Sequence, residues 1–502
     1  MFHRLIIFSS WLYITLIAPF TNGVSAQELE NLVETEIVSS APVPPPTRKG
    51  NDWPIFLGPD ENGHSHETDL RIDWSDGAPP VLWSKKIGTG YSAPSVRGNR
   101  LVIHHRPRNR EIIECCRADT GETLWRTSYP TDYSDPYGYN NGPRCSPILT
   151  DKYCYTYGAE GKLVCTELET GKLVWIRDVQ KDFQLPDWFF GVGCTPILEG
   201  NLLITLVGGQ PNSGVVAFDA RTGKTVWEAV GKETWDNAKT GWKSDPVYEW
   251  TGDEMVVSYS SPIAATIHGQ RHILCLVRQG LVSLDPKTGQ ENFHYWFRSR
   301  THESVNAARP VVVGDEILLS AAYRVGSALI KVAPNGKSVT EVWRDDENLL
   351  AHWSTPIYVD GYVYGFSGRH ENQGELRCLE WKTGDVIWQT NGLIVDPATL
   401  KQDPNTGQLL DKESNQPVPW PLFGRGSNIV FDGHFLILGE RGTLALSKIN
   451  SKRYEEIGRT SYPQIGVPAW AAPVLSRKRV FLRDEGDLIC LDFALRKAKQ
   501  QD

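Results

Sequence analysis

A short internal repeat constrains the fold of this 502-residue chain more than any other feature. It consists of a Thr-Gly pair, three intervening residues and a tryptophan. Four copies are present: Thr120-Gly121 with Trp125, Thr170-Gly171 with Trp175, Thr222-Gly223 with Trp227, and Thr383-Gly384 with Trp388. A fifth, Thr288-Gly289, has Phe293 in the tryptophan place. An alternating apolar segment precedes each turn, so each copy predicts a strand, a tight turn and a second strand.

A second landmark opens each unit. It is usually a small residue, then a proline, then β-branched residues, and one copy has asparagine in place of proline. The eight positions are Pro94, Pro147, Pro196, Pro262, Pro310, Pro356, Asn428 and Pro473. The chain between successive landmarks accommodates four short strands and a variable loop, so eight openings predict eight blades.

The composition agrees with an all-β chain. It includes 18 Trp, 18 Tyr and 45 Gly but only 2 Met, which is typical of many short strands closed by glycine turns. The net charge of −8 is spread along the chain, which argues against a nucleic-acid partner.

The ends of the repeat region predict how the blades close. The last unit stops at Leu488–Asp492 without an outer strand, whereas a spare strand, Val81–Lys86, precedes the first unit. Pairing them would remove two exposed sheet edges. We therefore expect an all-β, eight-bladed β-propeller of four-stranded antiparallel sheets at residues 51–495, closed by the N-terminal outer strand on the C-terminal blade, with a tail at 496–502.

The segment Phe218–Trp227, Phe-Asp-x-x-Thr-Gly-x-x-x-Trp, resembles the tryptophan-docking repeat of pyrroloquinoline-quinone-type propellers. That family includes quinoprotein alcohol dehydrogenases and BamB-like outer-membrane assembly lipoproteins, and the resemblance covers about residues 52–493. It implies that each repeat tryptophan packs between blades on the next turn, a structural role. The residues assigned to this role are Trp83, Trp125, Trp175, Trp227, Trp343 and Trp388.

The N-terminus predicts export. A charged start at His3 and Arg4, an apolar run and small residues before Gln27 indicate a signal peptide at residues 1–26, cleaved after Ala26. The alternative is a membrane anchor, although the run is short for a span. The proline-rich residues 27–50 are expected to be a disordered tether. The protein is then periplasmic or secreted, with no transmembrane span after cleavage.

Nine cysteines in an exported chain raise the question of disulfides. Several occupy a repeat position where other units have Ala or Ser, which favours small buried side chains. A disulfide between Cys145 and Cys194 stays open. The resemblance implies an adjacent-cysteine disulfide above the quinone in the dehydrogenases, but Cys115-Cys116 falls within a predicted strand, which favours a structural role.

No catalytic or metal-binding motif accompanies the repeats. The sequence lacks Cys-x-x-Cys-His, His-Glu-x-x-His, Gly-x-Ser-x-Gly and a phosphate-cradling glycine loop. The Glu, Asn and Asp set that would hold a quinoprotein calcium and act as base cannot be assigned. No catalytic residue or metal ligand is therefore predicted.

Strand order predicts where a ligand would bind. The long insertions all join one blade's outer strand to the next inner strand, so they belong to one face; they are 129–143, 180–193, 231–258, 297–308 and 389–426. The position three before each landmark is expected to ring the central channel at this loop face: Tyr91, Arg144, Gly193, Tyr259, Ala307, Trp353, Arg425 and Trp470. Nearby side chains expected to add polar contacts are Asn140, Asn141, Trp188, Asn306 and His352.

Two arginines among four aromatic residues suit a flat anionic ligand or a carboxylate-bearing peptide, although the same residues would also serve simply to fill the channel. Two functions follow. The favoured one is a monomeric, non-enzymatic scaffold that binds protein or peptide through its loop face. The alternative is a quinone-dependent dehydrogenase acting on alcohols or sugars, with pyrroloquinoline quinone and calcium, the quinone stacking on Trp470 or Trp353 and anchored by Arg144 and Arg425.

Overall fold

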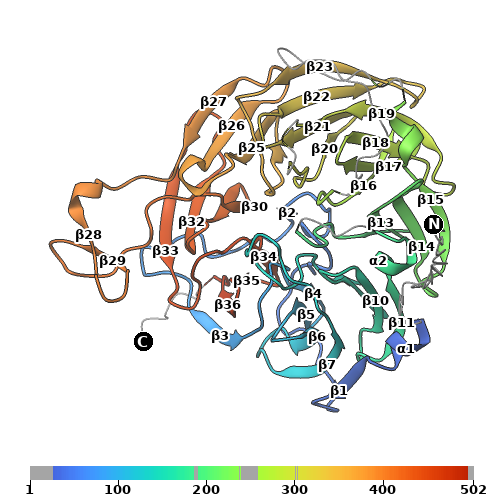
Figure 1. Ribbon diagram of the computed structural model, residues 1–502. Helices are drawn as coiled ribbons and strands as arrows, with labels where there is room; N and C mark the ends of the chain where they lie inside the picture. Colours follow the sequence, from blue (N-terminus) through green and yellow to red (C-terminus); the bar gives the residue numbers. More distant parts are fainter. Residues whose placement is uncertain are drawn as a thin grey trace, which may run out of the picture.

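Each repeat folds into one antiparallel sheet whose strands follow one another outwards from a central axis. The computed structural model describes residues 26–185, 190–236, 238, 258–299, 301 and 304–495. In chain order, eight such sheets form a closed ring (Figure 1). The expected eight-bladed β-propeller is confirmed.

Every landmark proline lies directly before the innermost strand of its blade. Blades 1 to 4 consist of β4 (Ser95–Arg97), β5 (Arg100–His105), β6 (Arg110–Arg117) and β7 (Thr123–Pro130); β8 (Ile148–Leu149), β9 (Tyr153–Tyr157), β10 (Lys162–Glu167) and β11 (Leu173–Asp178); β12 (Ile197–Glu199), β13 (Leu202–Gly209), β14 (Ser213–Asp219) and β15 (Thr225–Ala229); and β16 (Ile263–Ile267), β17 (Gln270–Val277), β18 (Gly280–Leu284) and β19 (Glu291–Trp296).

The other blades repeat this order. Blades 5 to 8 consist of β20 (Val311–Val313), β21 (Glu316–Ala321), β22 (Gly326–Val332) and β23 (Val339–Asp345); β24 (Ile357–Val359), β25 (Tyr362–Ser367), β26 (Glu375–Glu380) and β27 (Val386–Thr390); β30 (Ser427–Phe431), β31 (His434–Leu438), β32 (Thr443–Lys448) and β33 (Glu456–Ser461); and β34 (Val474–Ser476), β35 (Arg479–Arg483), β36 (Asp487–Asp492) and β3 (Val81–Lys86). The core lies between neighbouring blades, where apolar residues of adjacent sheets pack together.

The N-terminal strand closes the ring as expected. β3 pairs antiparallel with β36, and Trp83 lies opposite Cys490. The chain before blade 1 therefore completes the last blade through main-chain hydrogen bonds, and β36 is covered by β3 as the outermost strand.

The tryptophan-docking role is visible at six blade junctions. Each indole N–H donates to a backbone carbonyl in the turn between the last two strands of the next blade. The distances between donor and acceptor are 2.9–3.2 Å. The donors and acceptors are Trp83 to Ala118, Trp125 to Leu168, Trp175 to Ala220, Trp227 to Pro286, Trp343 to Trp381 and Trp388 to Asn450.

The glycine of the Thr-Gly turn lies against the indole ring of the docked tryptophan. A Cβ added at Gly223 would come within 2.8 Å of the Trp175 indole, and Gly223 has a φ of +69°. Both the left-handed backbone and the close approach therefore require glycine.

The junction from blade 7 to blade 8 is built differently. Gly458 occupies the register position of the docking tryptophan, opposite Leu446. The indole of Trp74, from the segment before β3, occupies the space of the missing docking tryptophan. A Cβ added to Gly458 would lie 2.6 Å from this indole. The missing tryptophan is thus supplied from elsewhere in the chain.

The expectation of a disordered tether at residues 27–50 is wrong. α1 (Ala26–Glu30) precedes β1 (Glu34–Ile37), which pairs antiparallel with β7 as a fifth strand of blade 1. Arg48 forms an ion pair with Asp492 at 2.7 Å. The prolines exclude a central strand but not an edge strand placed before them. The expected signal peptide, residues 1–26, lies almost wholly outside the described residues.

The insertion at 389–426 carries an arm of two short strands, β28 (Leu400–Gln402) and β29 (Leu409–Asp411), which extends outwards from the ring (Figure 1). Within the described parts of the chain, no helix is long and apolar enough to cross a membrane.

All nine cysteines lie within the described residues as buried, free thiols. Cys115 and Cys116 lie in β6, and Cys145 donates to the carbonyl of Cys194 at 3.1 Å. Burial raises the pKa of Cys194 to about 11 and that of Cys116 to about 12. These thiols therefore stay protonated and unreactive at neutral pH.

Substitutions at two glycines of blade 3 distinguish two losses of stability: one from backbone strain and one from displacing the docked indole. Gly200 has a φ of +61° and nothing within 4 Å of an added Cβ, whereas Gly223 faces Trp175. We expect Gly200→Ala to cost about 1–2 kcal/mol and Gly223→Ala about 1–3 kcal/mol more, because the indole must move. Urea unfolding of both variants measures the difference, and equal losses would contradict the role of the Trp175 contact.

Candidate functional site

The central channel contains a cavity of about 240 Å³. All eight positions expected to ring the channel line its wall: Tyr91, Arg144, Gly193, Tyr259, Ala307, Trp353, Arg425 and Trp470. They come together because each lies three residues before the landmark at the start of an innermost strand, and the eight strands surround one axis.

A segment that the repeats do not predict forms the floor. Residues 51–67 cross the ends of the innermost strands on the face opposite the loops. Trp53 exchanges two backbone hydrogen bonds with Val96 of blade 1, and the N–H of Val430 in blade 7 donates to the carbonyl of Gly63. Phe56 and Leu57 from this segment line the cavity. The channel is therefore blind, with its entrance at the loop face.

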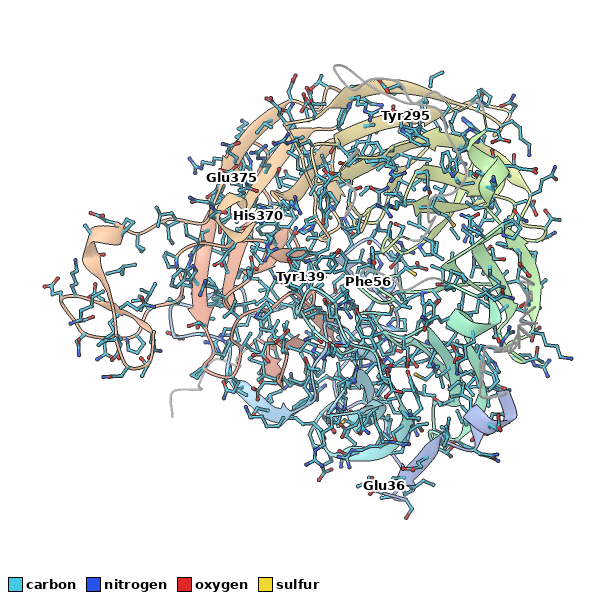
Figure 2. All side chains as sticks on the ribbon, in the orientation of Figure 1. Glu36, Phe56, Tyr139, Tyr295, His370 and Glu375 are labelled. Atoms are coloured by element: carbon cyan, nitrogen blue, oxygen red, sulfur yellow. The ribbon has the colours of Figure 1, made fainter. Side chains whose placement is uncertain are left out.

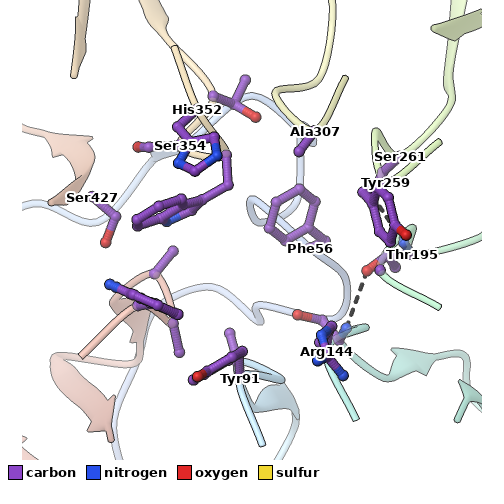
Figure 3. Close-up of a pocket in the computed structure, with 18 of the residues that line it drawn as sticks. Phe56, Tyr91, Arg144, Thr195, Tyr259, Ser261, Ala307, His352, Ser354 and Ser427 are labelled. Atoms are coloured by element: carbon purple, nitrogen blue, oxygen red, sulfur yellow. Dashed lines mark hydrogen bonds between the residues drawn. The ribbon is translucent and has the colours of Figure 1, made fainter. Parts of the chain in front are cut away.

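Eight of the residues that line the cavity are Phe, Tyr or Trp. The rings of Tyr91 and Trp470 lie 4.8 Å apart between centroids, and those of Trp353 and Trp470 lie 4.9 Å apart. Figure 3 shows Phe56 among Ala307, Tyr259 and His352. Figure 2 shows Phe56 and Tyr139 near the axis, whereas Glu36 on β1 lies at the rim.

Sequence reasoning missed four of the aromatic residues that line the cavity. Tyr139 and Phe190 belong to insertions, Tyr323 to the turn between β21 and β22, and Phe56 to the floor. Their sequence signal was limited, since none occupies the repeat position that identified the ring.

Arg425 is held by a buried carboxylate. Its Nε donates to Glu440 Oε2 at 3.1 Å, its Nη2 donates to Oε1, and its backbone N–H donates to Oε2 at 3.0 Å. Glu440 is only 2% exposed and also accepts from Trp470 Nε1 at 3.0 Å. The guanidinium lies 4.9 Å from the ring centroids of both Trp353 and Trp470.

Arg144 is also paired with a buried carboxylate. Its Nη2 donates to the buried Asp135 at 2.7 Å and to the carbonyl of Asn140 at 2.8 Å. Each guanidinium therefore already has a carboxylate partner within the protein, and the expectation that the two arginines hold an anionic ligand stays a prediction. What the arginines add to the wall is flat, neutralised surface.

The other residues, which were expected to add polar contacts at the channel, lie in different places. The Asn306 amide donates to the carbonyl of Val277 at 2.8 Å, Asn140 donates to Glu485 at 2.6 Å, and Asn141 accepts from the backbone N–H of Asp135 at 2.7 Å. These three support loops and do not line the cavity. Trp188 lies outside the described residues. Of the four that the structure describes, His352 alone lines the cavity.

His352 forms a pair with Tyr323 at the cavity wall, with 3.1 Å between Nε2 and the phenol oxygen. Tyr323 and Arg324 have φ values of 63° and 65°, a left-handed conformation that costs non-glycine residues about 1–2 kcal/mol each. Burial, followed by the cations of Arg425 and Arg369, lowers the pKa of His352 to about 3. The imidazole is therefore neutral at physiological pH.

The cavity does not fit a quinone with its calcium. Among its lining residues in the described chain there is no Asp or Glu, and no group of three His, Cys, Asp or Glu side chains there could hold a metal. Calcium takes about six to eight oxygen ligands, with carboxylates prominent among them. The arginines that would meet the quinone carboxylates are already paired.

Fold and site together define a closed PQQ-like β-propeller with a blind, aromatic central cavity. The family model described as outer membrane protein assembly factor BamB matches residues 108–390, more than half of the chain. The protein belongs to this family, and the resemblance carried by its tryptophan-docking repeat is confirmed.

Solved structures agree with the fold. BamB from Moraxella catarrhalis superposes with a TM-score of 0.52 at 12% sequence identity, covering 84% of this chain and 100% of that chain. Quinohemoprotein alcohol dehydrogenase from Comamonas testosteroni superposes with a TM-score of 0.58 at 12% identity, covering 90% and 82%. A comparison with curated protein sequences gives no significant match. At this identity the likeness concerns the fold alone.

The pairing of Arg425 predicts a structural role. Arg425→Ala leaves the Glu440 carboxylate buried without its cation, so we expect a loss of about 3–5 kcal/mol in the free energy of unfolding. The double variant Arg425→Met/Glu440→Gln removes both charges and should recover most of the loss. Urea unfolding checks both, and a single variant as stable as the wild type would refute the prediction.

His352 predicts a pH dependence of stability. Its folded-state pKa of about 3 lies below the ordinary 6.5, so its contribution is complete above pH 6.5 and is lost as the pH falls towards 3. Between pH 7 and 5 this one group should account for about 2 kcal/mol. We expect His352→Gln to reduce the fall in unfolding free energy by that amount. Burial also lowers the pKa of His105, so a smaller fall should remain.

Proposed function

We propose that this protein is a non-catalytic binding propeller that captures a protein or peptide ligand in its central cavity, entered from the loop face. The observation that carries the proposal is the blind aromatic cavity with both of its arginines neutralised by buried carboxylates. Aromatic pockets of this kind suit the anchoring side chain of a partner, because such anchors supply most of the energy of a protein interface.

The chemistry of the wall supports binding over catalysis. In the described residues that line the cavity, the titratable groups are tyrosines, His352 and the two paired arginines. The imidazole is too weak a base at neutral pH to abstract a proton efficiently, since an effective general base has a pKa near the working pH.

The family description supports a partner-binding role and an exported location, because it refers to assembly of outer membrane proteins. We extend this to a processed, monomeric protein cleaved after Ala26. In it, β1 would pair with β7 of blade 1, and the rest of α1 at the new N-terminus would contact β11 of blade 2.

Blocking the cavity tests the proposal. Ala307 lines the cavity, so Ala307→Phe places a ring inside it, whereas Ala398→Phe adds the same ring to the exposed arm. Peptides selected from a random library on the wild-type protein should bind Ala307→Phe at least tenfold more weakly and bind Ala398→Phe unchanged, by calorimetry. Equal binding to all three proteins would refute the cavity as the site.

The dehydrogenase alternative has its own measurement. The purified protein is mixed with pyrroloquinoline quinone and calcium and assayed with an artificial electron acceptor and alcohols or sugars. We expect no saturable change in absorbance and no turnover. Saturable binding with turnover would overturn the non-catalytic proposal.

A further inference from the structure

The eight blades provide an internal comparison at the cavity wall. In seven blades the landmark residue is a proline directly before the innermost strand, but in blade 7 it is Asn428, the second residue of β30. Departures from an otherwise consistent local pattern are expected at functional sites. Asn428 lines the cavity and is only 3% exposed.

A second departure lies beside it. The residue before the landmark bears a hydroxyl in several blades, and this hydroxyl accepts a backbone N–H from the preceding blade. Thr195 accepts from Ser146 at 3.0 Å, Ser261 accepts from Thr195 at 2.9 Å, and Thr355 accepts from Arg309 at 3.1 Å. Ser427 holds the same position in blade 7, yet its buried Oγ has no hydrogen-bond partner among the described residues.

Four neighbouring side chains of blades 6 and 7 share this property. Among the buried polar atoms of the described chain that have no hydrogen-bond partner are His352 Nδ1, Trp353 Nε1, Ser427 Oγ, and both Nδ2 and Oδ1 of Asn428. All four residues line the cavity. Buried polar groups are nearly always paired, so a set of unpaired ones at one wall points to a ligand that completes them.

The remaining walls differ in character. Tyr91, Tyr259, Trp470 and the floor residue Phe56 are apolar over most of their surface, and the paired arginines bring no net charge. A charged ligand would lose its hydration without gaining an unpaired counter-charge. A sugar carries hydroxyl groups around its whole rim and would leave those facing the aromatic walls unmatched.

We propose that the cavity takes a neutral, planar aromatic group with a hydrogen-bonding N–H or O–H on one edge, stacked among the aromatic walls and bonded through that edge to Asn428 and Ser427. This rests on the proposed function and names the anchor that the cavity selects. The cavity is smaller than the range of about 300–1,000 Å³ usual for drug-sized ligands, which suits one ring system. Its source is a tryptophan or tyrosine side chain of a peptide, or a free small aromatic molecule.

Two probes of nearly equal shape test the polar edge. Indole carries the N–H, and indene replaces it with carbon. We expect the wild-type protein to bind indole at least tenfold more tightly than indene, by calorimetry. Asn428→Leu should abolish this preference, and Asn201→Leu, an exposed asparagine in a turn of blade 3, should retain it.

Thermal unfolding distinguishes recognition from a structural role. Because the Asn428 amide has no partner among the described residues, Asn428→Leu should melt no lower than the wild type, since replacing an unpaired buried polar group by an apolar one removes an unfavourable term. A lower melting temperature would show that the amide is structural and would overturn the proposal. Equal binding of indole and indene by the wild type would overturn it as well.

The source of the ring is settled by comparing free indole with the capped peptide Gly-Gly-Trp-Gly-Gly. Tighter binding of the peptide identifies a side-chain anchor, and tighter binding of indole identifies a small molecule; both support the aromatic class. If library peptides still depend on Ala307 but indole shows no preference over indene, only this further inference fails. If they do not depend on Ala307, the proposed function fails.

Discussion

The packing of the docking tryptophans on the hairpin turn of the next blade, a glycine turn at five of the six junctions, is the contact on which the ring depends. A single sheet of this size has two apolar faces and cannot bury them alone, so neighbouring blades must cover one another. The indole covers the turn, and its N–H bonds the next blade. Where blade 7 lacks the tryptophan, Trp74 restores the packing against Gly458. Repeated around the axis, this contact keeps the innermost strands in a closed circle around a channel.

The channel becomes a site because another part of the chain closes one end. Residues 51–67 bond to the innermost strands of blades 1 and 7 and place Phe56 at the axis. Leu57 and Glu61 have left-handed φ values of 63° and 56°, which long side chains adopt at a cost in free energy. The main-chain bonds to several blades offset that cost. Access is then confined to the face where the insertions lie.

Symmetry makes the specialised parts of the wall recognisable. Seven blades present proline and one presents Asn428; several blades pair a hydroxyl with the preceding blade, and Ser427 does not. The two arginines, which look like the obvious ligand contacts, are paired with Asp135 and Glu440. The specificity that we propose for the cavity therefore depends on the neutral polar groups of blades 6 and 7.

The sequence by itself determined the number of blades, their closure by Val81–Lys86 and the eight positions around the channel. It could do so because turns and alternating strands place side chains at fixed sequence distances from each landmark. Eight repeats of the same distances make the pattern recognisable. The partners of those side chains were decided only by tertiary structure. Nothing in the spacing of Arg425 and Glu440 indicates their pairing, and nothing in the proline-rich leader indicates that β1 joins blade 1 or that residues 51–67 cross the channel. Such contacts depend on which distant segments meet when the ring closes, and no local periodicity records that.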